Sequence, residues 1–378
     1  MVELVREGLA LTGADAWLAY DFAGSNPPVR EALGLAGAHL TRRLFYLVPR
    51  KGEPLLIAHR LEAEALAHLP GRRALYARRE ELLLALAEAI SRYPRLALTY
   101  VPAGEVPYVS RVDAGTVELL RGLGAELVSD APVLLLFARW NEADLAAHRR
   151  AVKGVEAARE RALSYLRERL PDRPPGELEL QSLLIAELKS QGLVFDHPPI
   201  VAFGEHASLP HYAPSQETDR PLREGDVVLL DIWAREPEGP YADVTWMAAW
   251  KAGEAFYRAF YAVAEARDRV VRALKEKRSW RGFELDRLAR GVLERAGYKD
   301  AIRHRTGHSL GKESPHGYAT HLDDYETRDT RPLIPGLAFT VEPGVYPGPF
   351  GVRSEINVYL SEEGPVVTTA VQHAPSEL

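Results

Sequence analysis

The sequence predicts an α/β amino-terminal domain over residues 1–135, followed by an α+β domain over residues 141–378 with an internal pseudo-two-fold repeat. Three observations support this fold class. The chain has 378 residues, 46% hydrophobic and 26% charged, which is a globular composition and too long for one ordinary domain. Short apolar runs alternate with helical stretches in the first part, and two segments of the second part match each other at a constant offset.

The composition excludes several classes of protein and of site. Cysteine is absent, which rules out disulfides and thiol ligands and leaves oxygen and imidazole as metal ligands. The net charge of −6 and the lack of a basic tract argue against nucleic acid, and apolar runs such as Val133–Ala138 are too short to span a membrane. Glu3, Arg6 and Glu7 interrupt the amino end, so we expect no secretory signal and a cytoplasmic protein. Arginine greatly outnumbers lysine, which favours a thermophilic or high-GC source.

The first domain is predicted from short segments of alternating type. Its clearest segments are Leu44–Val48, Glu80–Ile90, Leu96–Val101 and Val133–Phe137. No paired carboxylates or histidine clusters occur in this part of the sequence. We therefore expect this domain to shape access to a site rather than to carry chemistry.

A long helix is predicted to begin the second domain. Asn141 precedes Asp144 by three residues, as in a capping box, and the prolines from Pro171 onward end the helix. One face of the segment carries Leu145, His148, Val152, Val155, Leu163, Leu166 and Leu170.

The repeat is read from two further helical segments. The matched positions are Glu179, Leu180, Leu183, Leu188 and Gly192, and, 105 residues later, Glu284, Leu285, Leu288, Leu293 and Gly297. Leucines at these spacings share a helical face and the glycine is a natural helix end, so two unrelated amphipathic helices would produce part of the match. Duplication is the favoured interpretation.

Each matched helix precedes a predicted hairpin that carries two acidic residues. The first hairpin pairs Val227–Asp231 with Tyr241–Trp250, and Asp243 lies near the start of the return strand. The second pairs Leu337–Glu342 with Arg353–Leu360 across a Gly/Pro-rich turn at 343–349, and its return passes through Glu355.

The four acids of these hairpins are Asp231, Asp243, Glu342 and Glu355. Each one alone has a simpler interpretation, a strand that ends in solvent. At matched places in two pseudo-symmetric hairpins, however, four carboxylates would repel each other unless a multivalent cation neutralised them. His308, between nearby glycines, adds an imidazole, and this donor set suits manganese, cobalt, iron or zinc better than calcium. Four carboxylates have enough charge for two divalent ions.

The order Asp, Asp, His, Glu, Glu resembles the dinuclear metallopeptidases of the pita-bread (creatinase/aminopeptidase-like) fold, most closely aminopeptidase P and prolidase. The stretches that carry the resemblance are Leu229–Asp231, Tyr241–Thr245, Thr306–Gly311, Phe339–Tyr346 and Gly351–Ile356. They fall within about residues 200–360, and the first domain resembles the family's amino-terminal domain only in layout.

The resemblance implies a role for each of the five residues. Asp231 chelates one metal ion, Asp243 and Glu355 bridge the pair, and His308 and Glu342 complete the second ion. Two such ions, with manganese the first choice and cobalt, zinc or iron as alternatives, generate a bridging hydroxide and polarise the scissile carbonyl. Glu342 also transfers the proton to the leaving nitrogen.

Further residues are matched by the resemblance to substrate contacts. His211 corresponds to a histidine at the cleft mouth, His316 to one that stabilises the tetrahedral intermediate, and His304 to a position in the substrate pocket. The loop before His316 is one residue longer than the family pattern, so His321 is an alternative. Arg353 shares a strand face with Glu355 and would orient substrate or ligands. For each of these residues, placement on an exposed surface is the competing interpretation.

Trp233, two residues after Asp231, stands where relatives commonly have a small residue, and we expect it to narrow the pocket or reshape the metal edge.

The function implied is hydrolysis of Xaa-Pro bonds in dipeptides or longer peptides, by a homodimer in the family manner. The alternatives are a peptidase-like binding module without turnover, a metal-free creatinase-like enzyme and a methionine-aminopeptidase-like activity. The complete ligand set disfavours the first two, and the long amino-terminal domain disfavours the third.

Overall fold

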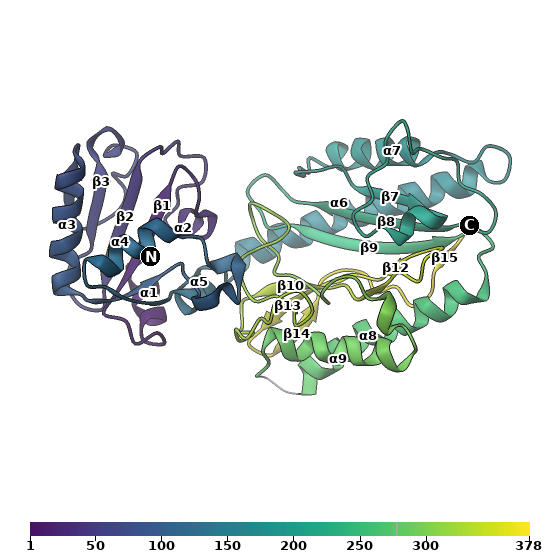
Figure 1. The fold of residues 1–378 in the computed structure, drawn as a ribbon. Coiled ribbons are helices and arrows are strands. Elements are labelled where there is room, and N and C mark those ends of the chain that lie inside the picture. The colour runs from purple at the N-terminus through teal and green to yellow at the C-terminus, as the bar shows by residue number, and fades with distance from the viewer. Residues whose placement is uncertain (277–278) are drawn as a thin grey trace. The chain divides into compact units, whose positions relative to one another are not determined.

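The computed structural model describes residues 1–276 and 279–378, which form two compact units, Met1–Ala138 and Arg139–Leu378 (Figure 1). No helix in these described ranges is both long enough and apolar enough to cross a bilayer.

The first unit is built on a six-stranded mixed sheet with the order β4-β3-β2-β1-β5-β6. Its strands are β1 Ala16–Phe22, β2 Arg43–Pro49, β3 Leu55–His59, β4 Arg72–Tyr76, β5 Arg95–Leu98 and β6 Glu126–Ser129. Its helices are α1 Val2–Leu9, α2 Pro27–Ala32, α3 Arg79–Arg92, α4 Ala114–Gly122 and α5 Ala131–Phe137, with short 3₁₀ turns at Arg60–Glu62, Pro102–Gly104 and Pro107–Val109. The apolar run Val133–Phe137 therefore lies in a helix, and the α/β class of this unit is confirmed.

Within residues 139–276 and 279–378, the second unit contains four long helices and three sheets. The helices are α6 Glu142–Arg169, α7 Glu177–Ser190, α8 Glu254–Glu276 and α9 Gly282–Arg295, with 3₁₀ turns at Gly204–Ser208 and Lys299–Ala301. The strands are β7 Ile200–Phe203, β8 Val227–Ala234, β9 Ala242–Ala249, β10 Ala338–Val341, β11 Gly344–Val345, β12 Val352–Arg353, β13 Ile356–Ser361, β14 Gly364–Val367 and β15 Ser376–Glu377. The sheet orders are β15-β9-β8-β7, β10-β13-β14 and β11-β12.

Each half of this unit is a sheet with a helix pair packed on it. Helices α6 and α7 share an apolar core with β7, β8 and β9, whereas α8 and α9 pack with β10 and β13 on the other side (Figure 1). Helix α6 begins at a reciprocal cap, in which the Asp144 amide donates to Asn141 Oδ1 (2.9 Å) and the Asn141 amide donates to Asp144 Oδ2 (3.0 Å). It ends at Arg169, and its C-cap Leu170 stands immediately before Pro171, as expected.

The internal repeat is confirmed by helices α7 and α9. Both have 14 residues, and both their first and their last residues are 105 positions apart. The glycines that follow them, Gly192 and Gly297, both take left-handed backbone, with φ of 71° and 89°. The leucines matched in the sequence at 180/285 and 188/293 are buried in the core of their own half.

The first hairpin agrees with the prediction, and the second differs from it in one respect. Strands β8 and β9 pair without interruption, as expected. Strands β10 and β13 also pair, but the segment between them folds into its own small ladder, where Gly344 pairs with Arg353. The predicted turn at 343–349 is therefore the first part of a longer connection between β10 and β13, in which Arg353 pairs with Gly344.

Candidate active site

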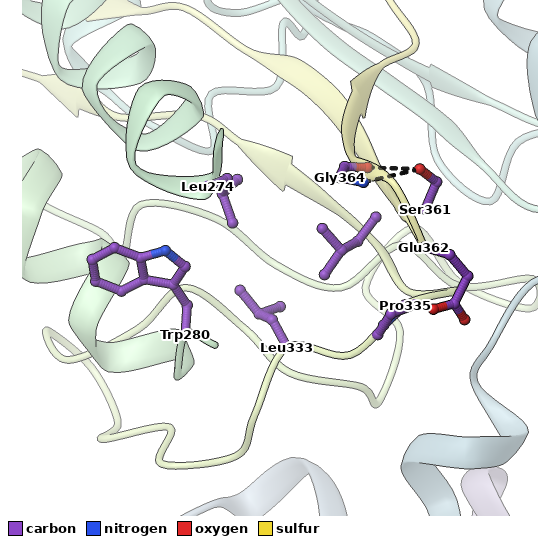
Figure 2. A pocket seen from close by; sticks show the side chains of 8 residues that line it. Leu274, Trp280, Leu333, Pro335, Ser361, Glu362 and Gly364 are labelled. Carbon is purple, nitrogen blue, oxygen red and sulfur yellow. Dashed lines mark hydrogen bonds between the residues drawn. The ribbon is translucent and has the colours of Figure 1, made fainter. Parts of the chain in front are cut away.

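The five predicted ligand side chains line one cavity in the second unit. This cavity has a volume of about 630 Å³, and its walls include Asp231, Asp243, His308, Glu342 and Glu355. The size is typical of a small-molecule site. A second cavity, of about 100 Å³, lies beside the β13–β14 turn and is lined largely by apolar side chains such as Leu274, Trp280 and Leu333 (Figure 2). The carboxylates make the larger cavity the candidate active site.

Strand register places the acids of the first hairpin. Asp231 on β8 lies opposite Thr245 on β9, and Asp243 lies opposite Trp233. The second hairpin is joined to the first at this point, because the Asp243 amide donates to Asn357 Oδ1 (3.0 Å). The amide of Glu355 in turn donates to the Thr245 carbonyl (3.3 Å). The backbone of both halves thus fixes where the carboxylates meet.

His308 presents one ring nitrogen to the carboxylates. Its Nδ1 lies 3.1 Å from the Ser309 carbonyl, a contact that requires Nδ1 to carry the proton and leaves the Nε2 lone pair available. Nε2 lies 3.5 Å from Asp243 Oδ2 and 3.3 Å from Glu342 Oε1. Ligand atoms of Asp243, His308 and Glu355, all buried, lie within 4.8 Å of one another. This spacing is compact enough for a shared ion.

Glycine at position 307 is needed for this approach. A Cβ atom there would lie 2.1 Å from the Thr340 carbonyl oxygen, a distance that no side chain tolerates. The expectation that glycine lets the backbone near His308 come close to its neighbours is therefore explained by a specific contact with β10.

Two buried threonines organise the ligands. The Thr245 hydroxyl lies 2.8 Å from Glu355 Oε2 and 3.2 Å from Asp231 Oδ1. The Thr340 hydroxyl accepts from the His308 amide (2.9 Å) and donates to Glu342 Oε1 (3.0 Å). Each hydroxyl orients a carboxylate from the side opposite the cavity, as outer partners of metal ligands do.

Arg353 is buried behind Asp231. Its Nη2 donates to Asp231 Oδ2 and its Nε donates to the Thr245 hydroxyl (2.8 Å). The side chain is 5% exposed, although Arg353 lines the cavity. This arrangement makes Arg353 a positioning residue for Asp231 more than a group free to bind substrate.

Burial and mutual repulsion shift the pKa values of the acids. Burial raises the pKa of Asp231 to about 7 against the opposing effect of Arg353, and burial together with neighbouring carboxylates raises the pKa of Glu355 well above its usual range. Burial also raises the pKa of Asp243. Glu342 is the exception, because the nearby imidazoles and Arg353 outweigh its burial and lower its pKa to about 2.

The donor set fits divalent metal ions. Glu355 Oε1 is buried and accepts no hydrogen bond from any residue that the structure describes. Leaving a buried carboxylate oxygen unpartnered is unfavourable, and a cation resolves both this and the repulsion among the acids.

His211 and His316 lie at the exposed part of the cavity wall. The His316 ring lies 4.1 Å from the His308 ring, measured between centroids. The longer loop before it is closed by a β-bridge between Leu310 and His316, and Lys312 pairs with Asp144 at 2.9 Å. His321 is fully buried and accepts from the Ser309 amide (3.1 Å), so it does not replace His316 in the cavity.

Both ring nitrogens of His304 have hydrogen-bond partners. Nδ1 donates to the Arg305 carbonyl (2.7 Å), and Nε2 lies 2.8 Å from the Tyr346 hydroxyl, which donates to it. His304 is not among the residues that line the cavity, and its contact with substrate stays a prediction.

Sequence reasoning missed the roles of Thr245, Thr340 and Asn357. Each lies two residues from an acid of the cluster, Thr245 from Asp243, Thr340 from Glu342 and Asn357 from Glu355, and this spacing of two was the available signal. Trp233 lines the cavity as expected and donates its Nε1 hydrogen to Asp196 Oδ1 (2.7 Å).

Proteins of known family are similar to this chain in sequence and in fold. A putative dipeptidase, YkvY of Bacillus subtilis, is 35% identical over 196 residues, 51% of this chain and 51% of that protein, so the chain spans about half the length of this relative. A probable dipeptidase, PepE of Mycobacterium tuberculosis, is 28% identical over 355 residues, 90% of this chain and 86% of that protein. The Xaa-Pro dipeptidase structure from Bacillus anthracis has a TM-score of 0.69 at 23% identity, over 100% of this chain and 99% of that one, which shows the shared fold. The model of metallopeptidase family M24 matches residues 146–362, and the predicted resemblance is thus confirmed: the chain belongs to metallopeptidase family M24.

Proposed function

We propose that the chain is a metal-dependent peptidase that hydrolyses Xaa-Pro bonds, as an Xaa-Pro dipeptidase or aminopeptidase. The observation that carries the proposal is the set of four carboxylates and one imidazole, all buried except the half-buried Glu342, in the wall of a cavity large enough for a small peptide. Family membership and the names of the relatives, dipeptidase and Xaa-Pro dipeptidase, support the same reaction.

The residues proposed to hold two divalent ions are Asp231, Asp243, His308, Glu342 and Glu355. Manganese is the proposed ion, with cobalt, zinc and iron as alternatives, because the donors are mostly hard oxygens. When bound, such ions lower the pKa of water and polarise the scissile carbonyl.

Side chains of the protein are proposed to transfer the proton to the leaving nitrogen, to orient the ligands and to contact the substrate. Glu342 is proposed to accept the proton of the nucleophile and to pass it to the leaving proline nitrogen, as a metal-bound carboxylate is able to do. Thr340 fixes one Glu342 oxygen. His211 and His316, at the exposed cavity wall, are proposed to contact the substrate and the oxyanion of the tetrahedral intermediate.

One reconstitution experiment tests the proposal. Metal-stripped protein is assayed with Ala-Pro, Ala-Pro-Ala and Met-Ala before and after addition of Mn²⁺ or Co²⁺. We expect metal-dependent hydrolysis of the proline substrates, loss of that activity in Asp243→Ala, and full activity in the control Asp172→Ala, whose side chain is on the surface. Preferred cleavage of Met-Ala would instead favour the methionine-aminopeptidase alternative, and full activity of Asp243→Ala would refute the proposal.

A cytoplasmic homodimer with an access-shaping domain at residues 1–135 and a catalytic domain at residues 141–378 completes the proposal, on the analogy with the family. Elution of the protein as a monomer across micromolar concentrations would contradict the dimer.

A further inference from the structure

Helix α9 carries a fully buried aspartate that belongs neither to the cavity wall nor to the proposed metal cluster. Asp286 has no exposed surface and is not among the residues that line the cavity. Its carboxylate accepts four hydrogen bonds from residues that the structure describes, which is about the full capacity of an ionised carboxylate. The proposed reaction gives this group no part.

Both oxygens of Asp286 have defined partners. Oδ1 accepts from the Thr306 hydroxyl at 2.7 Å and from the Thr306 amide at 3.0 Å. Oδ2 accepts from Arg290 Nε at 2.8 Å and from the Asp324 amide at 2.9 Å, so an arginine pairs with the buried acid. The carboxylate thus fixes both the backbone and the side chain of Thr306 from the helix.

Thr306 is joined directly to two of the proposed metal ligands. It precedes His308 by two residues, and its carbonyl accepts from the Glu342 amide at 2.7 Å. The His308 carbonyl accepts in turn from the Thr340 amide at 2.8 Å. The segment from Thr306 to His308 therefore pairs with β10 in the manner of a strand, and a shift of Thr306 would move His308 and Glu342 together.

The other end of the cluster has different supports. Asp231, which is proposed to chelate the first ion, accepts from Arg353 Nη2, and its Oδ1 lies 3.2 Å from the Thr245 hydroxyl. These two side chains come from strands β12 and β9, whereas Asp286 comes from helix α9. The ligands of the two ions are thus oriented from separate parts of the unit.

The internal repeat has a related contact in its first half. Gln181 on α7 stands 105 positions before Asp286 on α9, the offset that relates the two helices. Gln181 Nε2 donates to the carbonyl of Pro199, immediately before β7, at 2.8 Å. In both halves this helix position binds a segment that follows the helix. In the second half, where that segment carries a metal ligand, the residue is an acid paired with an arginine.

We infer that Asp286 is a positioning residue for His308 and Glu342, and that it sets the affinity of the ion that these two ligands complete without a comparable effect on the ion chelated by Asp231. This inference rests on the proposed function and deepens it. Asp286 acts through Thr306, whose place it fixes by two hydrogen bonds, and it does not touch the ion.

The competing explanation is that Asp286 only stabilises the packing of α9. Both explanations predict that Asp286→Asn, which keeps the size of the side chain and removes its charge, unfolds at a lower denaturant concentration than wild type. They differ in metal binding by protein that is folded. A role in packing alone leaves both ions bound as in wild type, or weakens both equally.

Calorimetric titration of metal-free protein with Mn²⁺, at a temperature where every variant is folded, measures the affinity for each ion. We expect Asp286→Asn to weaken one ion by about 10- to 100-fold, as removal of an outer partner of metal ligands typically does, and to leave the other nearly unchanged. Electron paramagnetic resonance provides a second readout, because the variant should give the spectrum of isolated Mn²⁺ at metal concentrations where wild type already holds coupled pairs.

A double variant identifies the ion that is affected. In His308→Ala the ion completed by His308 is already weakened or lost, so addition of Asp286→Asn should not weaken the remaining ion further. Thr306→Val is the milder variant if Asp286→Asn does not fold, because it removes only the hydroxyl bond to Asp286, and it should weaken the same ion to a smaller extent.

Asp226→Asn is the matched control in the same unit. Asp226 also pairs with an arginine, Arg220 (2.7 Å), and accepts from a backbone amide, that of Arg223 (2.8 Å), but it lies immediately before β8 and does not line the cavity. This control should lose stability and keep its affinity for both ions.

Three results would overturn the inference and leave the peptidase function intact. They are equal weakening of both ions in Asp286→Asn, unchanged affinities in Asp286→Asn or, if that variant does not fold, in Thr306→Val, and a further loss in the double variant. Absence of Xaa-Pro hydrolysis in wild type that binds two ions would refute the proposed function alone, since the titrations still test Asp286. Wild type that does not bind two ions would refute both.

Discussion

Replacement of Thr245 by valine removes one hydroxyl from the centre of the carboxylate cluster at nearly constant volume. The side chain is fully buried. Its oxygen accepts from Arg353 Nε at 2.8 Å and lies 2.8 Å from Glu355 Oε2, the carboxylate to which it donates. Valine leaves the guanidinium N–H without this acceptor and Glu355 without this donor, and no water from bulk solvent reaches the position.

The size of the effect follows from these contacts. A hydrogen bond to a charged group contributes about 1.5–3 kcal/mol, so loss of the Arg353 contact alone should lower the unfolding free energy by about 2 kcal/mol. Removal of an outer partner of metal ligands typically weakens metal binding by about 10- to 100-fold. We expect Thr245→Val to show both losses.

Calorimetric titration of metal-free protein with Mn²⁺, together with denaturant unfolding, measures the two losses. Thr320→Val is the matched control, because Thr320 is equally buried in the same unit but donates to the Pro332 carbonyl (2.7 Å), away from the cavity. The control should lose stability and keep its manganese affinity. An affinity for Thr245→Val within twofold of wild type, or an equal loss in the control, would refute the positioning role of Thr245.

Three further predictions concern the same unit. In metal-free protein, burial raises the pKa of Glu355 in the folded state, so the favourable contribution of this carboxyl group to stability is present at low pH and is lost as pH rises above its pKa in the unfolded chain. Glu355→Gln should therefore unfold at a higher denaturant concentration than wild type at pH 8, with a smaller difference at pH 4.5. The same variant should lose metal affinity. Burial lowers the pKa of His148 from 6.5 to about 4, so stability should fall by about 3 kcal/mol as pH drops from 6.5 to 4, and denaturant curves of His148→Gln should show a correspondingly smaller drop. Gly307→Ala forces a methyl group against the Thr340 carbonyl and should lower both the thermal midpoint and the manganese affinity. Gly253→Ala is the control and should change neither, because no atom lies within 4 Å of the added methyl group. Unchanged manganese affinity in Gly307→Ala would contradict the importance of this close approach for the site.

The sequence was sufficient for the parts of the structure that depend on local patterns. The reciprocal cap at Asn141 and the proline at 171 set the ends of α6, and leucine spacing with a terminal glycine identified α7 and α9 as copies. Two-residue alternation and Gly/Pro turns located the hairpins. These signals are local because capping, helical periodicity and turn geometry act over a few residues.

Features that depend on tertiary contacts were not predictable in the same way. The family resemblance placed His304 in the substrate pocket, but it does not show that the Tyr346 hydroxyl lies 2.8 Å from His304 Nε2. The β11–β12 ladder forms because its two short segments meet over the sheet, which turn residues alone do not specify. Asp196 is read as a plain loop acid until the Trp233 indole is seen to hold it. For His304 and Asp196 the deciding partner lies 42 and 37 residues away along the chain.

The division of the acids between the two halves has a consequence for folding. Asp231 and Asp243 come from the first half, whereas His308, Glu342 and Glu355 come from the second. Neither half alone carries all five donors, so metal binding stabilises only the state in which the two halves are packed together. Saturating manganese should therefore make the amide hydrogen-exchange rates of the β8–β9 and β10–β13 strand pairs more alike, because the two halves of the second unit would then open together.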